Sequence, residues 1–144
     1  MGIYFFAEDV DMPKIDFQAV QKVLKREIRI NKCKLGLINY IFCSDPYLLD
    51  INIKFLKHDY FTDVITFDYT DGLVVSGDIY ISTDMVMNNS VIFSQIFQEE
   101  LMRVISHGLL HLLKFNDKEE EEVIAMRRKE SDMLNSFKGY SIIL

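Results

Sequence analysis

The segment from Ile96 to Phe115 most constrains the fold, because its spacing predicts a helix that is apolar over most of its circumference. Apolar side chains recur on adjoining faces at Phe97, Leu101, Val104, Ile105, Leu109 and Leu112. Such a helix must be covered on several sides, so we expect it to be central and buried. At 144 residues, 49% of them hydrophobic, the chain can build one sizeable core. The sequence therefore predicts a single domain over residues 1–144.

The remaining periodicity supplies the elements that could cover this helix. Strands are expected at Ile3–Phe6, Gly36–Cys43, Asp63–Tyr69 and Gly77–Ser82. Further helices are expected after Pro13, from Tyr47 to Lys57, from a Ser82 cap to Phe93, and from Asp117 to Phe137. The turn sequence Thr70-Asp71-Gly72 joins the last two strands. Because strands come first and most helices later, we predict an α+β fold, with a mixed sheet of about four strands covered by helices.

Two of the chain's three histidines lie four residues apart on the predicted central helix. Residues i and i+4 share one face of a helix, so His107 and His111 can direct imidazole nitrogens at one cation. Asp117 follows the helix, where the chain can turn back and supply an oxygen. Three protein ligands leave a tetrahedral cation with one open position, which is typical of a catalytic zinc site. The alternative for each histidine is a hydrogen-bonded place in the core.

Two neighbours of the histidines bear on this interpretation. Gly108 costs a helix about 1 kcal/mol relative to alanine, which favours a site that a substrate or another backbone approaches closely. It also stands where HExxH proteases have their general-base glutamate, so that activity is excluded. Asp117 and Glu120 have the spacing of a capping box, in which Asp117 would begin the last helix. The two roles of Asp117 are compatible, because its two carboxylate oxygens can serve different partners.

The residues around the histidines resemble a known family. HGLLHLLKFND, at residues 107–117, is similar to the HGxLHLxGYDH signature of the YbeY family. Three further segments agree in order and spacing. DYFTDVITF at 59–67 resembles the family's DxxTDVLSF segment, GDIYI at 77–81 resembles its GDI strand, and 99–104 resembles the approach to its histidine helix. The resemblance covers most of the chain, from about Ile3 to the last helix.

The sequence departs from the family pattern at three positions. The third histidine of the signature falls on Asp117, its glycine falls on Lys114, and an arginine expected before the DxxTDV segment falls on Leu56. Aspartate is an ordinary but harder zinc ligand, so the ligand change affects the choice of metal. The resemblance implies that the absent arginine would hold a phosphate. The nearest side chains that could replace it are Lys57, Lys54 and His58. Alternatively, these three residues only form the solvated end of a helix.

The resemblance implies a metal-dependent endoribonuclease that cleaves single-stranded RNA in rRNA maturation, including processing of the 16S rRNA 3′ end, and in ribosome quality control. Its metal ligands would be His107, His111 and Asp117, holding one Zn²⁺ per chain or another divalent transition metal. Its catalytic residues would be His107 and His111, with Lys57 as our candidate for the part of the absent arginine. Its partners would be rRNA precursors and the ribosome or small-subunit proteins. The alternative is a ribosome-associated assembly or RNA-binding factor with a structural metal. A weaker alternative is a non-haem iron enzyme, because two histidines and a carboxylate also describe a facial triad.

Charge tests the RNA hypothesis, since the formal net charge is −6. Residues 14–34, however, hold seven basic and two acidic side chains. The basic ridge, which we define as Lys22, Lys25, Arg26 and Arg29, falls on the side of its helix away from the apolar positions. It could follow a phosphate backbone, or it could be a solvated polar face. Arg103 could add a positive charge one turn from His107, or it could pair with Glu99 in the same row.

The rest of the sequence bears on the compartment. The two cysteines, Cys33 and Cys43, have no metal-binding spacing, so we expect reduced thiols in a cytoplasmic protein. The sequence contains no secretory signal pattern and no apolar run of 18 residues, and we expect no membrane association.

Overall fold

The computed structural model describes residues 1–139. Its strands are β1 (Gly2–Ala7), β2 (Lys34–Cys43), β3 (Val64–Asp68) and β4 (Val74–Ser82). Its helices are α1 (Phe17–Ile30), α2 (Asp45–Leu56), α3 (Thr83–Ile92), α4 (Phe97–Leu112) and α5 (Glu120–Lys138). The four strands form one sheet in the order β1-β2-β4-β3, in which only β3 is antiparallel to its neighbour. The predicted α+β fold with a mixed four-stranded sheet is confirmed.

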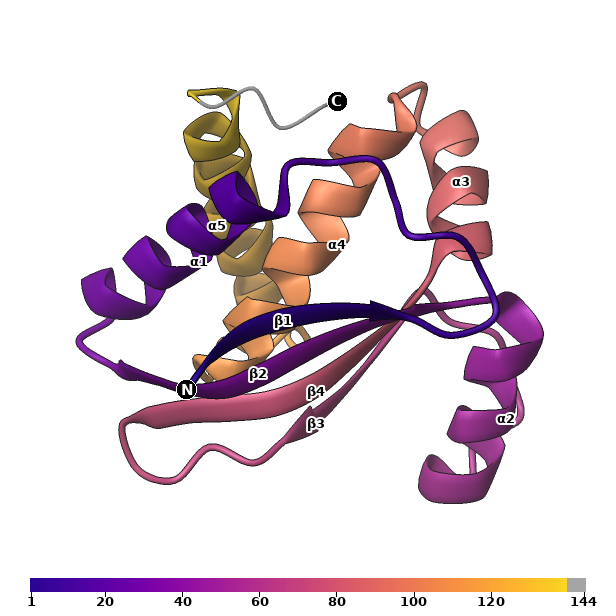
Figure 1. Cartoon of the computed structure of the whole chain (residues 1–144), viewed down its shortest axis with the longest axis horizontal. Coiled ribbons are helices and arrows are strands. Elements are labelled where there is room, and N and C mark those ends of the chain that lie inside the picture. The colour runs from indigo at the N-terminus through magenta and orange to yellow at the C-terminus, as the bar shows by residue number, and fades with distance from the viewer. Residues whose placement is uncertain (140–144) are drawn as a thin grey trace.

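The helices divide between the two faces of the sheet. Helices α1, α4 and α5 lie over one face, as Figure 1 shows, and together with that face they form the main hydrophobic core. Helix α2 packs on the opposite face, where Leu48 and Ile51 contact Cys43 and Ile65. The larger core therefore lies on the side of the sheet that carries α4.

The boundaries of the elements follow the residues that favour them. Asp16, Ser44 and Ser82 cap α1, α2 and α3, because each side chain accepts hydrogen bonds from backbone N–H groups of the first turn. The turn between β3 and β4 is the predicted one, with Gly72 at φ +59°, a conformation that glycine adopts without strain. Strand β4 begins three residues before the predicted Gly77, at Val74.

Helix α4 is the central buried helix that its composition predicts. Leu101, Val104, Ile105 and Leu109 are fully buried on it. The helix lies close to the sheet at Gly108, where an added Cβ would come within 2.8 Å of Ile79 Cγ2. Gly108 therefore makes room for the side chain of Ile79 on β4, and not for a substrate or another backbone. Within residues 1–139, no helix combines the length and the apolar composition that crossing a membrane requires.

Candidate metal centre

The end of α4 brings the two histidines and Asp117 together. His107 and His111 lie on the last turns of α4, and the chain then reverses through Lys114, which adopts φ +72°. Phe115 N–H donates to the carbonyl of Leu110, and Lys114 N–H donates to that of His111. These two bonds form a Schellman motif, which closes the helix and turns the chain back along it. The reversal places Asp117 over the imidazole rings.

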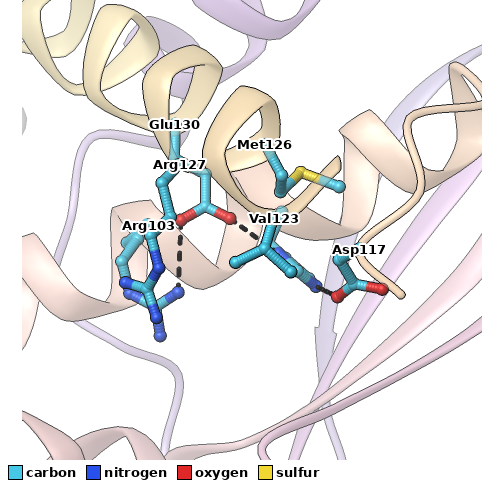
Figure 2. Close-up of a pocket in the computed structure, with 7 residues that line it drawn as sticks. Arg103, Asp117, Val123, Met126, Arg127 and Glu130 are labelled. Atoms are coloured by element: carbon cyan, nitrogen blue, oxygen red, sulfur yellow. Dashed lines mark hydrogen bonds and ion pairs between the residues drawn. The ribbon is translucent and has the colours of Figure 1, made fainter. Parts of the chain in front are cut away.

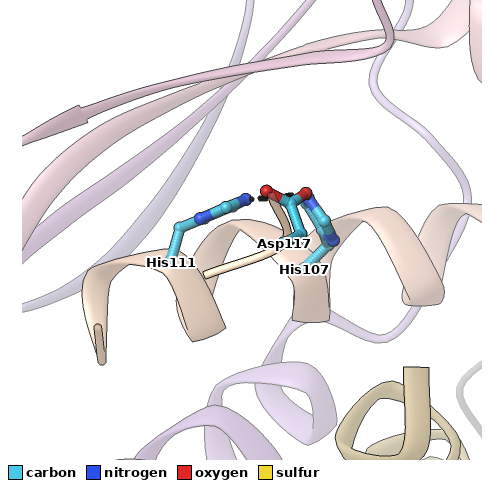
Figure 3. A group of neighbouring side chains, drawn as sticks. All are labelled: His107, His111 and Asp117. Atoms are coloured by element: carbon cyan, nitrogen blue, oxygen red, sulfur yellow. Dashed lines mark hydrogen bonds and ion pairs between the residues drawn. The ribbon is translucent and has the colours of Figure 1, made fainter. Parts of the chain in front are cut away.

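The three side chains converge on one small space, which Figure 3 shows above α4. One carboxylate oxygen of Asp117, Oδ2, lies 3.3 Å from His107 Nε2 and 3.4 Å from His111 Nε2. The two Nε2 atoms are 2.9 Å apart. Metal–ligand bonds of about 2.0–2.1 Å in a tetrahedron put neighbouring ligand atoms about 3.3 Å apart. Two imidazole nitrogens and one carboxylate oxygen at these separations fit a zinc-sized cation.

The structure assigns the helix cap to another residue. The N-cap of α5 is Glu119, whose side chain accepts from the N3 backbone while Glu122 Oε1 accepts from Glu119 N–H at 3.0 Å. Of the two roles considered for Asp117, the cap of the last helix with Glu120 is therefore wrong, because the same capping spacing recurs two residues later. Asp117 precedes the helix and directs its carboxylate at the histidines.

A buried glutamate of α5, which the sequence analysis missed, fixes the orientation of His107. Glu130 is 3% exposed, and its Oε2 lies 2.7 Å from His107 Nδ1. A carboxylate can only accept this hydrogen bond, so Nδ1 carries the proton and the lone pair of Nε2 faces Asp117 and His111. The sequence does hold a signal for it. Glu130 interrupts an apolar row at helical spacing that is formed by Met126, Met133 and Phe137.

Arg103 connects this glutamate to further carboxylates. Its guanidinium Nε donates to Glu100 at 2.8 Å, and its Nη1 donates to Glu130 Oε1 at 3.3 Å. The hydrogen bonds that Arg103 donates to Glu100 raise the pKa of Arg103 above its usual range, so Arg103 stays cationic. The predicted pairing of Arg103 with Glu99 is wrong, because Glu99 is exposed, whereas Glu100 lies on the buried side of α4 and pairs with Arg103.

Burial also shifts the pKa values of two groups in this region, His111 and Asp63. It lowers the pKa of His111, with a smaller effect in the same direction from the charge of His107, so neutral imidazole is favoured there. A neutral ring nitrogen is the form that binds a cation. Burial raises the pKa of Asp63, although Arg103 Nη2 lies 3.7 Å from its carboxylate and opposes the shift.

A small pocket between α4 and α5 adjoins these residues (Figure 2). Its lining consists of Arg103, His107, Asp117, Val123, Met126, Arg127 and Glu130. Two members of the triad formed by His107, His111 and Asp117 therefore face a cavity. Two arginines line the same cavity, which makes it a place where an anion could approach the triad.

The structure does not bring Lys57 to the triad. Lys57 is the C-cap of α2, with φ 56°, and it is exposed. It belongs neither to the triad nor to the lining of the pocket. The other two residues near Leu56 have partners of their own, since Lys54 pairs with Asp50 and His58 stacks on Tyr60.

The basic ridge has the orientation that the sequence predicts. Lys22, Lys25, Arg26 and Arg29 are all exposed on α1, whereas Val20, Val23, Leu24 and Ile28 are buried. The four cations thus project into solvent, where a polyanion could reach them.

An α+β fold whose buried helix presents two histidines to a carboxylate defines a candidate metalloenzyme. The model of the family described as "Endoribonuclease YbeY" matches residues 6–138, and the chain belongs to this family. A relative named "Endoribonuclease YbeY" from Parabacteroides distasonis is 45% identical over 134 residues, covering 93% of this chain and 94% of that one. Another of that name, from Christiangramia forsetii, is 43% identical over 135 residues, covering 94% of each.

A solved structure shares the fold. The solution structure of TM1509 from Thermotoga maritima superposes with a TM-score of 0.66 and 24% sequence identity, and the match covers 95% of this chain and 89% of the TM1509 chain. The resemblance that the histidine signature indicated is therefore confirmed, as is the predicted fold class.

Proposed function

We propose that this chain is a metal-dependent endoribonuclease that cleaves single-stranded RNA, with His107, His111 and Asp117 as its metal ligands. The convergence of Asp117 Oδ2 on both Nε2 atoms, at 3.3 and 3.4 Å, carries the proposal. It is supported by membership of a family whose relatives carry the name endoribonuclease.

Each residue of the site has a part in this chemistry. A bound divalent cation would supply a Lewis acid and a water of lowered pKa at a scissile phosphodiester. His107 and His111 would hold the cation rigidly, because α4 is buried in the core and cannot shift easily. Glu130 would keep the Nε2 lone pair of His107 directed at the cation by accepting the Nδ1 proton.

We assign Zn²⁺ as the cation, one per chain, because two imidazoles and a carboxylate are ordinary zinc ligands that leave an open position. The aspartate is a harder ligand than the family's third histidine, so another divalent transition metal is the alternative. We propose an rRNA precursor as the substrate, with processing of the 16S rRNA 3′ end as the reaction, and the ribosome or its small-subunit proteins as partners. The free thiols of Cys33 and Cys43 support a reducing, cytoplasmic location.

One observation favours a second candidate function, a ribosome-associated assembly or RNA-binding factor with a structural metal. Arg103, which lies on α4 one turn before His107, already forms ion pairs with Glu100, Glu130 and Asp63. Lys57 lies outside the pocket, so neither side chain is free there to orient a phosphate. If no other cation serves this role, the site would bind a metal without cleaving RNA.

Metal analysis of untagged protein, followed by incubation with labelled single-stranded RNA, tests the proposal. We expect about one metal per chain, and cleavage that is lost with a chelator and in His111→Ala. His58→Ala is the matched control, because His58 stacks on Tyr60 outside the triad, and it should cleave normally. Tight RNA binding without cleavage by the metal-loaded parent would favour the assembly factor. Cleavage that survives both the chelator and His111→Ala would refute the metal site.

A further inference from the structure

A phosphodiester that reaches the triad meets carboxylates as well as cations. Asp117 and the buried Glu130 both line the pocket, and Arg103 links Glu130 to a further buried carboxylate, that of Glu100. An RNA phosphate adds another negative charge to this region. Beside the bound metal, a side-chain cation that is not already neutralised would offset part of that charge, because like charges at short range repel strongly in a poorly solvated site.

Two of the cations near the triad are committed to other partners. Arg103 is only 26% exposed and lies within ion-pair distance of Glu100, Glu130 and Asp63. Lys114 holds the carboxylate of Asp68 on β3. Removing Arg103 from the buried Glu100 and Glu130 to bind RNA would leave charges uncompensated, whereas Lys114 is already neutralised in an exposed pair.

Arg127 differs from these two cations because it both lines the pocket and has no carboxylate partner in the part of the chain that the structure describes. It lines the pocket together with His107 and Asp117, and its side chain is exposed. Within residues 1–139, no carboxylate lies within 4.0 Å of its guanidinium, whereas the other pocket arginine, Arg103, has three. It precedes Glu130 by three residues, so one face of α5 presents both side chains to the pocket (Figure 2).

We propose that Arg127 binds the scissile phosphate of single-stranded RNA and holds it against the triad. This inference rests on the proposed function and adds the residue that positions the substrate. A guanidinium suits this role, because its planar fork can donate two hydrogen bonds to two phosphate oxygens. Helix α5 then serves the site twice: Glu130 orients a ligand from the buried side, and Arg127 binds the substrate at the open side.

The test compares Arg127→Ala with Arg128→Ala. Both changes remove one arginine from adjacent exposed positions of α5, but Arg128 does not line the pocket. We expect Arg127→Ala to lower kcat/KM for single-stranded RNA by about 100-fold or more, as when one donor to a reacting oxyanion is removed. Arg128→Ala should stay within about threefold of the parent, as a distant surface charge does. Arg127→Lys should recover part of the loss, since it restores the charge without the planar fork.

A second measurement does not depend on catalysis. Binding of a short fluorescein-labelled single-stranded RNA to the metal-free protein should weaken in Arg127→Ala, with a salt slope smaller by somewhat less than one unit. Metal affinity and melting temperature should equal those of the parent, because Arg127 is exposed and unpaired within residues 1–139.

The outcomes separate this inference from the proposed function. If the parent cleaves RNA and Arg127→Ala behaves like Arg128→Ala, the inference is wrong and the proposed function stands. If Lys57→Ala loses cleavage while Arg127→Ala does not, Lys57 holds the phosphate and the inference is likewise overturned. If the metal-loaded parent neither binds nor cleaves single-stranded RNA, both fail together.

Discussion

Helix α5 contacts α1 and α4 through two consecutive residues, Lys129 and Glu130, and the two contacts have different consequences. Lys129 reaches α1, where its Nζ lies 2.6 Å from Glu27, and Glu130 reaches α4, where it accepts from His107. In both contacts a nearly buried glutamate meets a nitrogen of the adjacent helix. The α1 contact joins two packed helices. The α4 contact also determines which nitrogen of a histidine faces the triad.

The difference lies in the partner of each glutamate. Lysine is a flexible point charge with three equivalent donors, so its pairing with Glu27 specifies little beyond proximity. Imidazole has two distinct nitrogens, so a proton held at one of them leaves the other as an acceptor in a fixed direction. The same kind of buried contact therefore supports packing between α1 and α5 and prepares a site between α4 and α5.

The largest expected effect comes from the third ligand of the α4–α5 site. Asp117→Asn should weaken zinc binding by more than about 100-fold, beyond the effect of losing a group that only orients a ligand. Asp117→His should restore much of the affinity. Because Glu119 caps α5, neither change should cost the helix its cap. Zinc titration against a chromogenic chelator, with melts of the metal-free forms, measures both effects. Parent-like affinity in Asp117→Asn would remove Asp117 from the ligand set.

The next effect compares the two glutamates directly. Glu130→Gln should lower zinc affinity by about 10–100-fold, because the amide is a weaker acceptor for the proton on His107 Nδ1. Glu27→Gln should leave zinc affinity unchanged and lower the unfolding free energy by about 1–2 kcal/mol, since Lys129 keeps access to solvent. Equal zinc affinities in the two variants would show that both contacts only support packing.

A smaller effect is expected on the α1 side. Neutralising all four residues of the basic ridge should weaken binding across RNA sequences and flatten the salt dependence by somewhat less than one unit for each lost phosphate contact. Zinc affinity should not change, because the basic ridge lies on α1 and the ligands on α4 and the turn after it. An unchanged salt slope would mean that the ridge is a solvated face and that RNA is held elsewhere.

These residues also show what the sequence could and could not predict. The elements and the histidine pair were predictable, because helical spacing and turn chemistry are local properties. The cap of α5 was not, because Asp117-x-x-Glu120 and Glu119-x-x-Glu122 satisfy the same pattern and tertiary contacts decide between them. The partner of His107 was not predictable either, because Glu130 lies 23 residues further along the chain. Local patterns thus located the ligands and missed the residue that orients them.

The smallest effect concerns the turn that carries Asp117 from α4 towards α5. Lys114 has φ +72°, where a side chain costs about 1–2 kcal/mol relative to glycine, and the family signature has glycine at this position. Its pairing with Asp68 is mostly exposed and contributes little. Lys114→Gly should therefore raise the unfolding free energy by about 1 kcal/mol, and Lys114→Ala should not, since alanine keeps the strain.

Lys57→Gly is the matched control, because Lys57 has nearly the same conformation at the end of α2, away from the triad. Both glycine variants should stabilise the chain, as chemical denaturation would measure, and neither should weaken zinc binding. If Lys114→Gly stabilises the chain but lowers zinc affinity while Lys57→Gly does not, the lysine helps to place Asp117. The turn would then belong with Glu130 among the features that prepare the α4–α5 site.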